Sequence, residues 1–111
     1  MLSIEDLINQ IKSYNPNANF DLIKKSYNYG FNAHKGQYRA SGEIYFTHPV
    51  QVAKIVIDLK LDESTIKTAL LHDTVEDTDS SLNQLEIVFG KEVSQLVDGV
   101  TKLTNLELSS L

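Results

Sequence analysis

The chain has 111 residues, of which 41% are hydrophobic and 23% charged, and its formal net charge is −5 at pH 7. These values are typical of one globular domain and exclude a globally basic surface for nucleic acid. Cysteine is absent, which excludes disulfides and cysteine-ligated zinc, and no apolar run approaches the ~20 residues of a membrane span. We therefore expect a cytoplasmic protein that binds neither nucleic acid nor membranes.

The first third of the chain predicts two helices and a long loop. Residues 3–14 carry apolar side chains at helical spacing, and Ser3 with Asp6 forms a capping-box pattern. A second helix is expected from residue 20 to about residue 35, with aromatic and aliphatic residues on one stripe. The glycine-containing segment 36–46 then breaks the helical pattern, and an ordered loop of this length is more often functional than not.

A third helix is expected to begin near Thr47, with Pro49 tolerated in its first turn. We expect its inward face to consist of Val52, Ile55, Val56 and Leu59. His48 shares the side of Val52 and Ile55, so its side chain is predicted to follow this buried stripe.

The second half of the chain predicts three further helices. Asp62 is a suitable N-cap for a fourth helix, which we expect to run to about Glu76. A fifth helix is expected over residues 82–89, where Gly90 would end it, and a sixth from Lys91 could continue to the end of the chain. Because no alternating strand pattern is present, the sequence predicts an all-α bundle of about six helices in a single domain, residues 1–111.

The segment ALLHDTVEDT, residues 69–78, brings a histidine and three acids to the end of the fourth predicted helix. His72 and Asp73 are adjacent, and Glu76 and Asp77 follow within about one turn, so their side chains can converge on one region. Acids this close repel one another unless a cation lies among them. Acids are also disfavoured at a helix C-terminus, so their presence indicates a function rather than a contribution to stability.

With His48, the pair His72 and Asp73 forms a donor set that suits Mn²⁺, Fe²⁺ or Zn²⁺. The two acids that follow could orient or deprotonate an attacking water. Each feature alone also has a simpler explanation, because a histidine at a helix start is commonly a cap or a core polar group, and an acidic turn is commonly solvated. His34 is not expected to be a ligand, since a histidine in the last turn of a helix suits the dipole.

Three motifs, in this order, resemble the hydrolase domain of the RelA/SpoT-homologue family, a branch of the HD-domain phosphohydrolases. They are AHKGQYRASGEIYFTHPVQVAKIV, ALLHDTVEDT and FGKEVSQLVDGVTKL, and the resemblance covers roughly residues 20–105. It implies a helical bundle around a Mn²⁺ site. It also implies removal of the 3′-pyrophosphate from guanosine tetraphosphate and pentaphosphate, which gives GDP or GTP and pyrophosphate. The family's synthetase is a separate downstream domain, so synthetase activity is not expected.

The resemblance also implies roles for seven residues. The metal ligands are His48, His72 and Asp73, the acidic pair that activates or positions water is Glu76 and Asp77, and the residues of the nucleotide site are Arg39 and Ser41. Ala40 stands where the family often has lysine, so one cation near the nucleotide is lost.

One family feature is missing from the sequence. In the family, an aspartate beyond the DGVTKL motif is the fourth metal ligand; Asp98 belongs to that motif and is not the ligand. We therefore expect an incomplete, C-terminally truncated hydrolase domain, whose open side a second copy could complete as a homodimer. Two alternatives stay open: an inactive domain that binds nucleotide or a partner protein, and another HD-type phosphohydrolase such as a nucleotidase.

Overall fold

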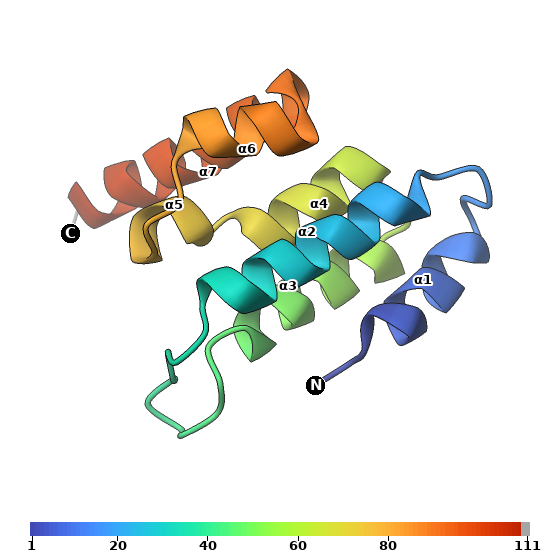
Figure 1. Cartoon of the computed structure of the whole chain (residues 1–111), viewed down its shortest axis with the longest axis horizontal. Helices are drawn as coiled ribbons and strands as arrows, with labels where there is room; N and C mark the ends of the chain where they lie inside the picture. The colour runs from blue at the N-terminus through green and yellow to red at the C-terminus, as the bar shows by residue number, and fades with distance from the viewer. Residues whose placement is uncertain (110–111) are drawn as a thin grey trace.

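The computed structural model describes the backbone of residues 1–109 and the side chains of residues 1–103. The helices of this part are α1 (Ile4–Lys12), α2 (Phe20–Ala33), α3 (Thr47–Asp58), α4 (Glu63–Leu71), α5 (Thr74–Asp77), α6 (Leu82–Phe89) and α7 (Lys91–Ser109) (Figure 1). The described residues form no strand beyond one antiparallel bridge between Tyr38 and Ile44. The all-α prediction is therefore confirmed. No helix in this part of the chain is long and apolar enough to span a membrane.

Several helix ends follow from local sequence signals. Ser3 and Asp6 form the predicted capping box at the start of α1. The Asp62 side chain accepts a hydrogen bond from the Thr65 amide and so caps α4 as expected. Gly90 ends α6 with a φ of +95°, a backbone conformation that side chains other than glycine rarely adopt.

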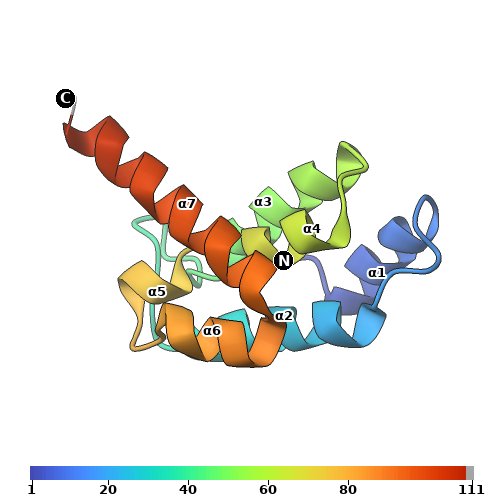
Figure 2. The ribbon, with the colours of Figure 1, turned by 90° about the horizontal axis from the view of Figure 1, so that it is seen from above.

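Helix α4 is the centre of the bundle. It packs against α2, α3 and α7, while α6 and α7 pack against each other. Figure 2 shows α7 extending beyond the other helices toward the C-terminus. Leu70 belongs to the core cluster shared with α1, α2 and α3, whereas Leu71 belongs to a second cluster with α6 and α7. The end of α4 therefore lies where the two clusters meet, which holds the residues that follow it in a fixed position.

Helices α2 and α4 approach each other closely at Gly30. A Cβ atom there would lie 2.5 Å from Cε1 of Phe46 and 2.7 Å from the carbonyl oxygen of Leu70. Only glycine fits this crossing without movement of the Leu70 backbone. The contact places the end of α2, the start of α3 and the end of α4 side by side.

The predicted inward face of α3 is wrong at two positions. Ile55 and Leu59 are 60% and 65% exposed, although Val52 and Val56 are partly buried against the core. The buried apolar residues of the helix are Pro49, Val50, Ala53 and Ile57. Apolar residues occur on nearly every side of α3, so spacing alone does not select a face. Contact with α1 and α4 selects it.

The fourth helix ends earlier than predicted. It stops at Leu71, and the one-turn helix α5 follows after His72 and Asp73. The buried Thr74 hydroxyl donates a hydrogen bond of 2.8 Å to the Leu71 carbonyl, an alternative partner to the helical backbone ladder. Because the continuous helix to Glu76 is absent, His72 and Asp73 form the joint between two helices.

Candidate metal centre

Three side chains expected to bind metal meet at the ends of three helices. His48 lies in the first turn of α3, His72 caps the end of α4, and Asp73 precedes α5. His48 Nε2 is 3.8 Å from Asp73 Oδ2, and His72 Nε2 is 3.2 Å from Asp73 Oδ1. One possible ligand atom from each residue lies within 4.8 Å of the other two. The tertiary structure therefore brings together His48 and His72, which are 24 positions apart in the sequence.

The hydrogen bonding of His72 determines which ring nitrogen is available. Its Nδ1 lies 2.7 Å from the carbonyl oxygen of Ala69. A carbonyl oxygen only accepts, so Nδ1 carries the proton and Nε2 is the atom turned to Asp73. In a neutral imidazole, Nε2 has a lone pair, and a lone pair facing a carboxylate oxygen at 3.2 Å is unfavourable unless a cation lies between them. A backbone carbonyl that fixes the far nitrogen is the usual arrangement of a metal-binding histidine.

His48 is also suited to coordination. Burial lowers the pKa of its imidazole below the ordinary value, and His72 and Arg39 act in the same direction, while Asp73 opposes them. The neutral ring favoured by this shift keeps a lone pair for a metal. Two imidazole nitrogens and one carboxylate oxygen form a donor set for a divalent transition metal, and three protein ligands leave coordination positions open.

The two acids of α5 differ in their contacts. Tyr45 Oη lies 2.8 Å from Asp73 Oδ2 and 3.2 Å from Asp77 Oδ2, so one phenol bridges the two carboxylates. Burial, followed by the hydrogen bond to Asp73, raises the pKa of Tyr45 well above its ordinary value, so the phenol stays a donor. Glu76 is exposed, and among the described residues its carboxylate makes no hydrogen bond or ion pair.

The loop before α3 carries the two residues expected to contact a nucleotide, and both are exposed. The Arg39 amide donates to the Glu43 carbonyl at 2.8 Å, and Gly42 donates back to Arg39 at 2.9 Å, which closes a tight turn. Ser41 Oγ donates to the Glu43 carboxylate at 3.2 Å. Arg39 is near enough to lower the pKa of His48, so its charge acts at the metal site. Ser41 lies at the turn itself, and no contact with the three metal-site residues is formed.

Sequence reasoning missed three residues around this site. Tyr45 contacts the carboxylates of Asp73 and Asp77, Gln37 donates to the Asp77 carbonyl, and His34 hydrogen-bonds Gln37. The position of Tyr45, three residues before His48 at a helix start, was a usable signal. Nothing in the local pattern around Gln37 indicated its partner 40 residues later.

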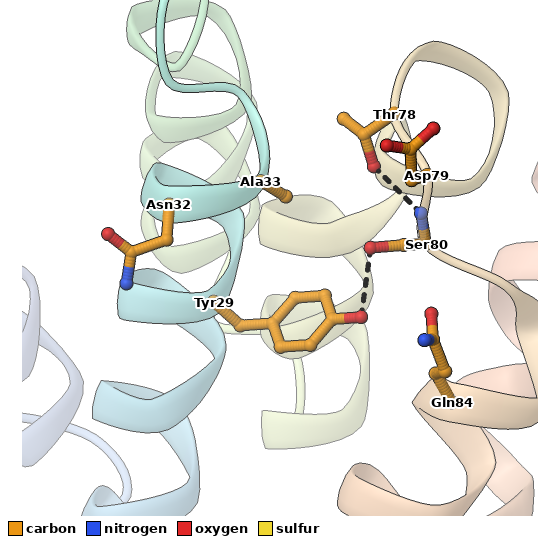
Figure 3. A pocket seen from close by; sticks show the side chains of 7 residues that line it. All are labelled: Tyr29, Asn32, Ala33, Thr78, Asp79, Ser80 and Gln84. Atoms are coloured by element: carbon orange, nitrogen blue, oxygen red, sulfur yellow. Dashed lines mark hydrogen bonds between the residues drawn. The ribbon is translucent and has the colours of Figure 1, made fainter.

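A hollow of about 450 Å³ lies away from the three metal-site residues, between α2 and the segment that joins α5 to α6 (Figure 3). Tyr29 Oη donates to Ser80 Oγ at 2.9 Å, and the Ser80 amide donates to Thr78 Oγ1 at 3.1 Å. These polar groups are already paired with one another, and no cationic side chain lines the hollow. We assign no site to it.

An apolar groove of about 250 Å³ lies directly beside the metal site. It is lined by Val52, Val56, Thr65, Thr68, Ala69, His72 and Val100. The groove opens between α3, α4 and α7, so one side of His72 faces a surface that is almost wholly apolar.

Comparison with known proteins identifies the family. The family described as HD domain matches residues 26–110, which include both histidines and the aspartate of the site. The chain belongs to the HD-domain family. Its HD domain is 44% identical over 110 residues to a GTP pyrophosphokinase rsh of Brucella melitensis. It is also 44% identical over 107 residues to the bifunctional (p)ppGpp synthase/hydrolase SpoT of Escherichia coli. The resemblance to RelA/SpoT homologues is thereby confirmed.

The alignments cover this HD domain and a small part of each relative. They include 99% and 96% of this chain but only 15% of either relative. A solved structure of a metazoan orthologue of SpoT, described as hydrolysing ppGpp, is similar with a TM-score of 0.66 and 33% identity. That similarity covers 69% of this chain and 46% of the solved one. The HD domain therefore has the fold of a SpoT-type hydrolase.

Proposed function

We propose that this HD domain is a Mn²⁺-dependent phosphohydrolase that removes the 3′-pyrophosphate of ppGpp and pppGpp. The observation that carries the proposal is the turn of His72 Nε2 toward Asp73, with Nδ1 already committed to a backbone carbonyl. A metal cation bound between Nε2 and the carboxylate makes this arrangement favourable, as a proton on Nε2 also would. The described activities of the SpoT relatives supply the substrate class. A single domain, residues 1–111, and a cytoplasmic location stay predictions of the sequence.

Each residue of the site has a chemical task in this proposal. His48, His72 and Asp73 hold the metal. A bound divalent metal supplies a polarised phosphoryl oxygen and a water of lowered pKa. Glu76 and Asp77 would orient the attacking water or accept its proton, and the exposed carboxylate of Glu76, which has no partner among the described residues, would be free to do so. Arg39 pairs with phosphate or stacks on guanine, and Ser41 donates to the nucleotide from the same loop.

The activity is tested by pyrophosphate release. The chain, freed of metal and then loaded with Mn²⁺, is expected to release pyrophosphate from ppGpp and to stop when a chelator is added. Other nucleotides serve as controls, and phosphate release from nucleoside monophosphates with none from ppGpp would favour a nucleotidase instead. A Mn²⁺-loaded sample that releases no pyrophosphate from ppGpp would contradict the proposal.

The apolar groove supports a second candidate, in which the domain also associates with a second copy of itself. Val52 and Val56 on α3 and Val100 on α7 line the groove, and exposed apolar side chains occur on the same two helices at Ile55 and Leu103 and at Leu59, the residue after α3. An α7 stripe of one copy could cover the α3 stripe of the other, and a two-fold axis would repeat the contact. Such a dimer would cover the apolar groove beside His72.

Light scattering tests this association. The unmodified chain is expected to be a dimer, and Ile55→Lys is expected to make it a monomer, because a charge would be buried in the interface. Ile87→Lys on α6, an exposed apolar position outside the groove, is the control and should leave the mass unchanged. A monomeric unmodified chain at high concentration would contradict self-association.

A further inference from the structure

The Gln37 side chain connects the end of α2 to the acidic turn of the site. Its Nε2 donates a hydrogen bond of 2.6 Å to the carbonyl oxygen of Asp77, and its Oε1 lies 2.9 Å from His34 Nδ1. Its backbone is held as well, because the Gln37 amide donates to His34 and the Tyr45 amide donates to Gln37. The backbone of Gln37 and the oxygen of its side chain are therefore held by hydrogen bonds other than the one to Asp77.

The chemistry of these groups determines which atom donates in each of the two hydrogen bonds. The Asp77 carbonyl oxygen only accepts, so the Gln37 atom that faces it is the amide nitrogen. The opposite atom is then the Gln37 oxygen, which also only accepts, and His34 Nδ1 must carry the proton between them. The direction of donation therefore runs from His34 through Gln37 to Asp77.

His34 is an unusual choice of core residue if its role is stability alone. It is 3% exposed and packs its ring against Tyr45 and Phe46. Its Nε2 is buried and has no hydrogen-bond partner among the described residues. Burying a nitrogen without a hydrogen-bond partner is unfavourable. A phenylalanine would fill the same space and would not bury an unpaired nitrogen. The polar atom that justifies a histidine here is Nδ1, through its bond to Gln37.

The acidic turn needs outside support. Helix α5 has one turn, with the Asp77 and Thr78 amides donating to Asp73 and Thr74. A single helical turn is marginal by itself, because ordering its residues costs more than its few hydrogen bonds return. Tyr45 holds the Asp77 carboxylate and Gln37 holds the Asp77 backbone, so the turn is fixed from both sides.

We propose that Gln37, oriented by the buried His34, is a positioning residue that sets where the carboxylates of Glu76 and Asp77 lie relative to the metal ligands. This inference rests on the proposed function for its catalytic consequence. It adds a connection from the start of the loop after α2 to α5 that uses neither a metal ligand nor the side chains of Arg39 and Ser41. A displacement of about 1 Å in a catalytic group is enough to cost on the order of 100-fold in rate.

The test uses two substitutions that keep shape and remove hydrogen bonds. Gln37→Met keeps the length of the side chain and removes both bonds, and His34→Phe keeps the packed ring and removes the Nδ1 donor. For each, we expect kcat for pyrophosphate release to fall about 10- to 100-fold, with KM and Mn²⁺ affinity changed less than about threefold. Gln95→Met, an exposed glutamine on α7, is the matched control and should behave as the unmodified chain.

Thermal stability separates positioning from structural support. His34→Phe removes the unpaired buried Nε2 together with the hydrogen bond from Nδ1 to Gln37, two opposing effects, so its melting temperature is expected to stay close to that of the unmodified chain while kcat falls. Hydrogen exchange at the Asp77 and Thr78 amides is expected to quicken in Gln37→Met. An unchanged kcat in both variants, or a loss of kcat matched by a general loss of stability in both, would overturn the inference.

The exchange measurement also separates the two proposals. An unmodified chain without hydrolysis would overturn the proposed function and, with it, the catalytic consequence of Gln37. Faster exchange at Asp77 and Thr78 in Gln37→Met would still show that Gln37 positions the turn. Unchanged exchange in that variant would overturn the positioning role itself, whatever the activity of the unmodified chain.

Discussion

Asp73→Asn is expected to reduce pyrophosphate release by at least ~100-fold. We also expect a large loss of Mn²⁺ affinity. Mutation of a residue that only hydrogen-bonds a metal ligand typically costs ~10–100-fold in affinity, and loss of the ligand itself should cost more. Asp73 is the group that the other side chains share: one carboxylate oxygen faces His72 and the other faces His48 and Tyr45. Asparagine keeps the shape but removes the negative charge that a divalent cation requires.

The same substitution is expected to leave the fold intact or to stabilise the metal-free chain. The carboxylates of Asp73 and Asp77 share Tyr45, so the substitution removes a repulsion between two acids. Calorimetric titration with Mn²⁺ measures the affinity, and thermal unfolding without metal measures the stability. Asp79→Asn, an exposed acid outside the site, is the control. Mn²⁺ binding by Asp73→Asn at the unmodified affinity would exclude Asp73 as a ligand.

Phe46→Ala is expected to lower the free energy of unfolding by about 3–5 kcal/mol, a large share of a small domain's stability. The Phe46 side chain is 1% exposed and packs edge-on against Tyr27 and Phe31, with ring centroids 5.1 and 6.0 Å apart. Gly30 lies directly against the same ring. Loss of the ring would leave a cavity where α2, α3 and α4 meet.

Urea unfolding monitored by circular dichroism measures this change. Tyr38→Ala, which removes an exposed aromatic ring of the preceding loop, should cost about 0.5 kcal/mol or less. Because Phe46 lies two residues before His48, Mn²⁺ affinity is expected to fall with stability. A loss below about 1 kcal/mol would mean that the aromatic cluster repacks and that the core around α4 is less specific than the structure indicates.

Local signals in the sequence predicted the helices and most of their ends. The capping box at Ser3, the N-cap at Asp62 and the glycine at position 90 all act within a few residues of the helix that they bound. Short-range hydrogen bonds determine these features, so they can be read from the sequence before the fold is known. The paired motifs around His48 and His72 likewise indicated a metal site, because their residue types have few other uses in combination.

Only the tertiary structure decided which face of α3 is buried and where the fourth helix ends. The apolar residues of α3 cover nearly all its sides, so contact with neighbouring helices chose Val50 and Ala53 over Ile55. The break after Leu71 depends on packing around the buried Thr74, which helical periodicity does not reveal.

The connection from His34 through Gln37 to Asp77 also lies beyond local pattern. It joins residues 40 positions apart through one side-chain hydrogen bond, and glutamine in a loop carries no signal of its partner. The sequence by itself determined the helices and the residue types of the site, because both depend on short-range chemistry. The tertiary structure alone decided how the acidic turn is held, because that depends on distances between elements that only the packed core defines.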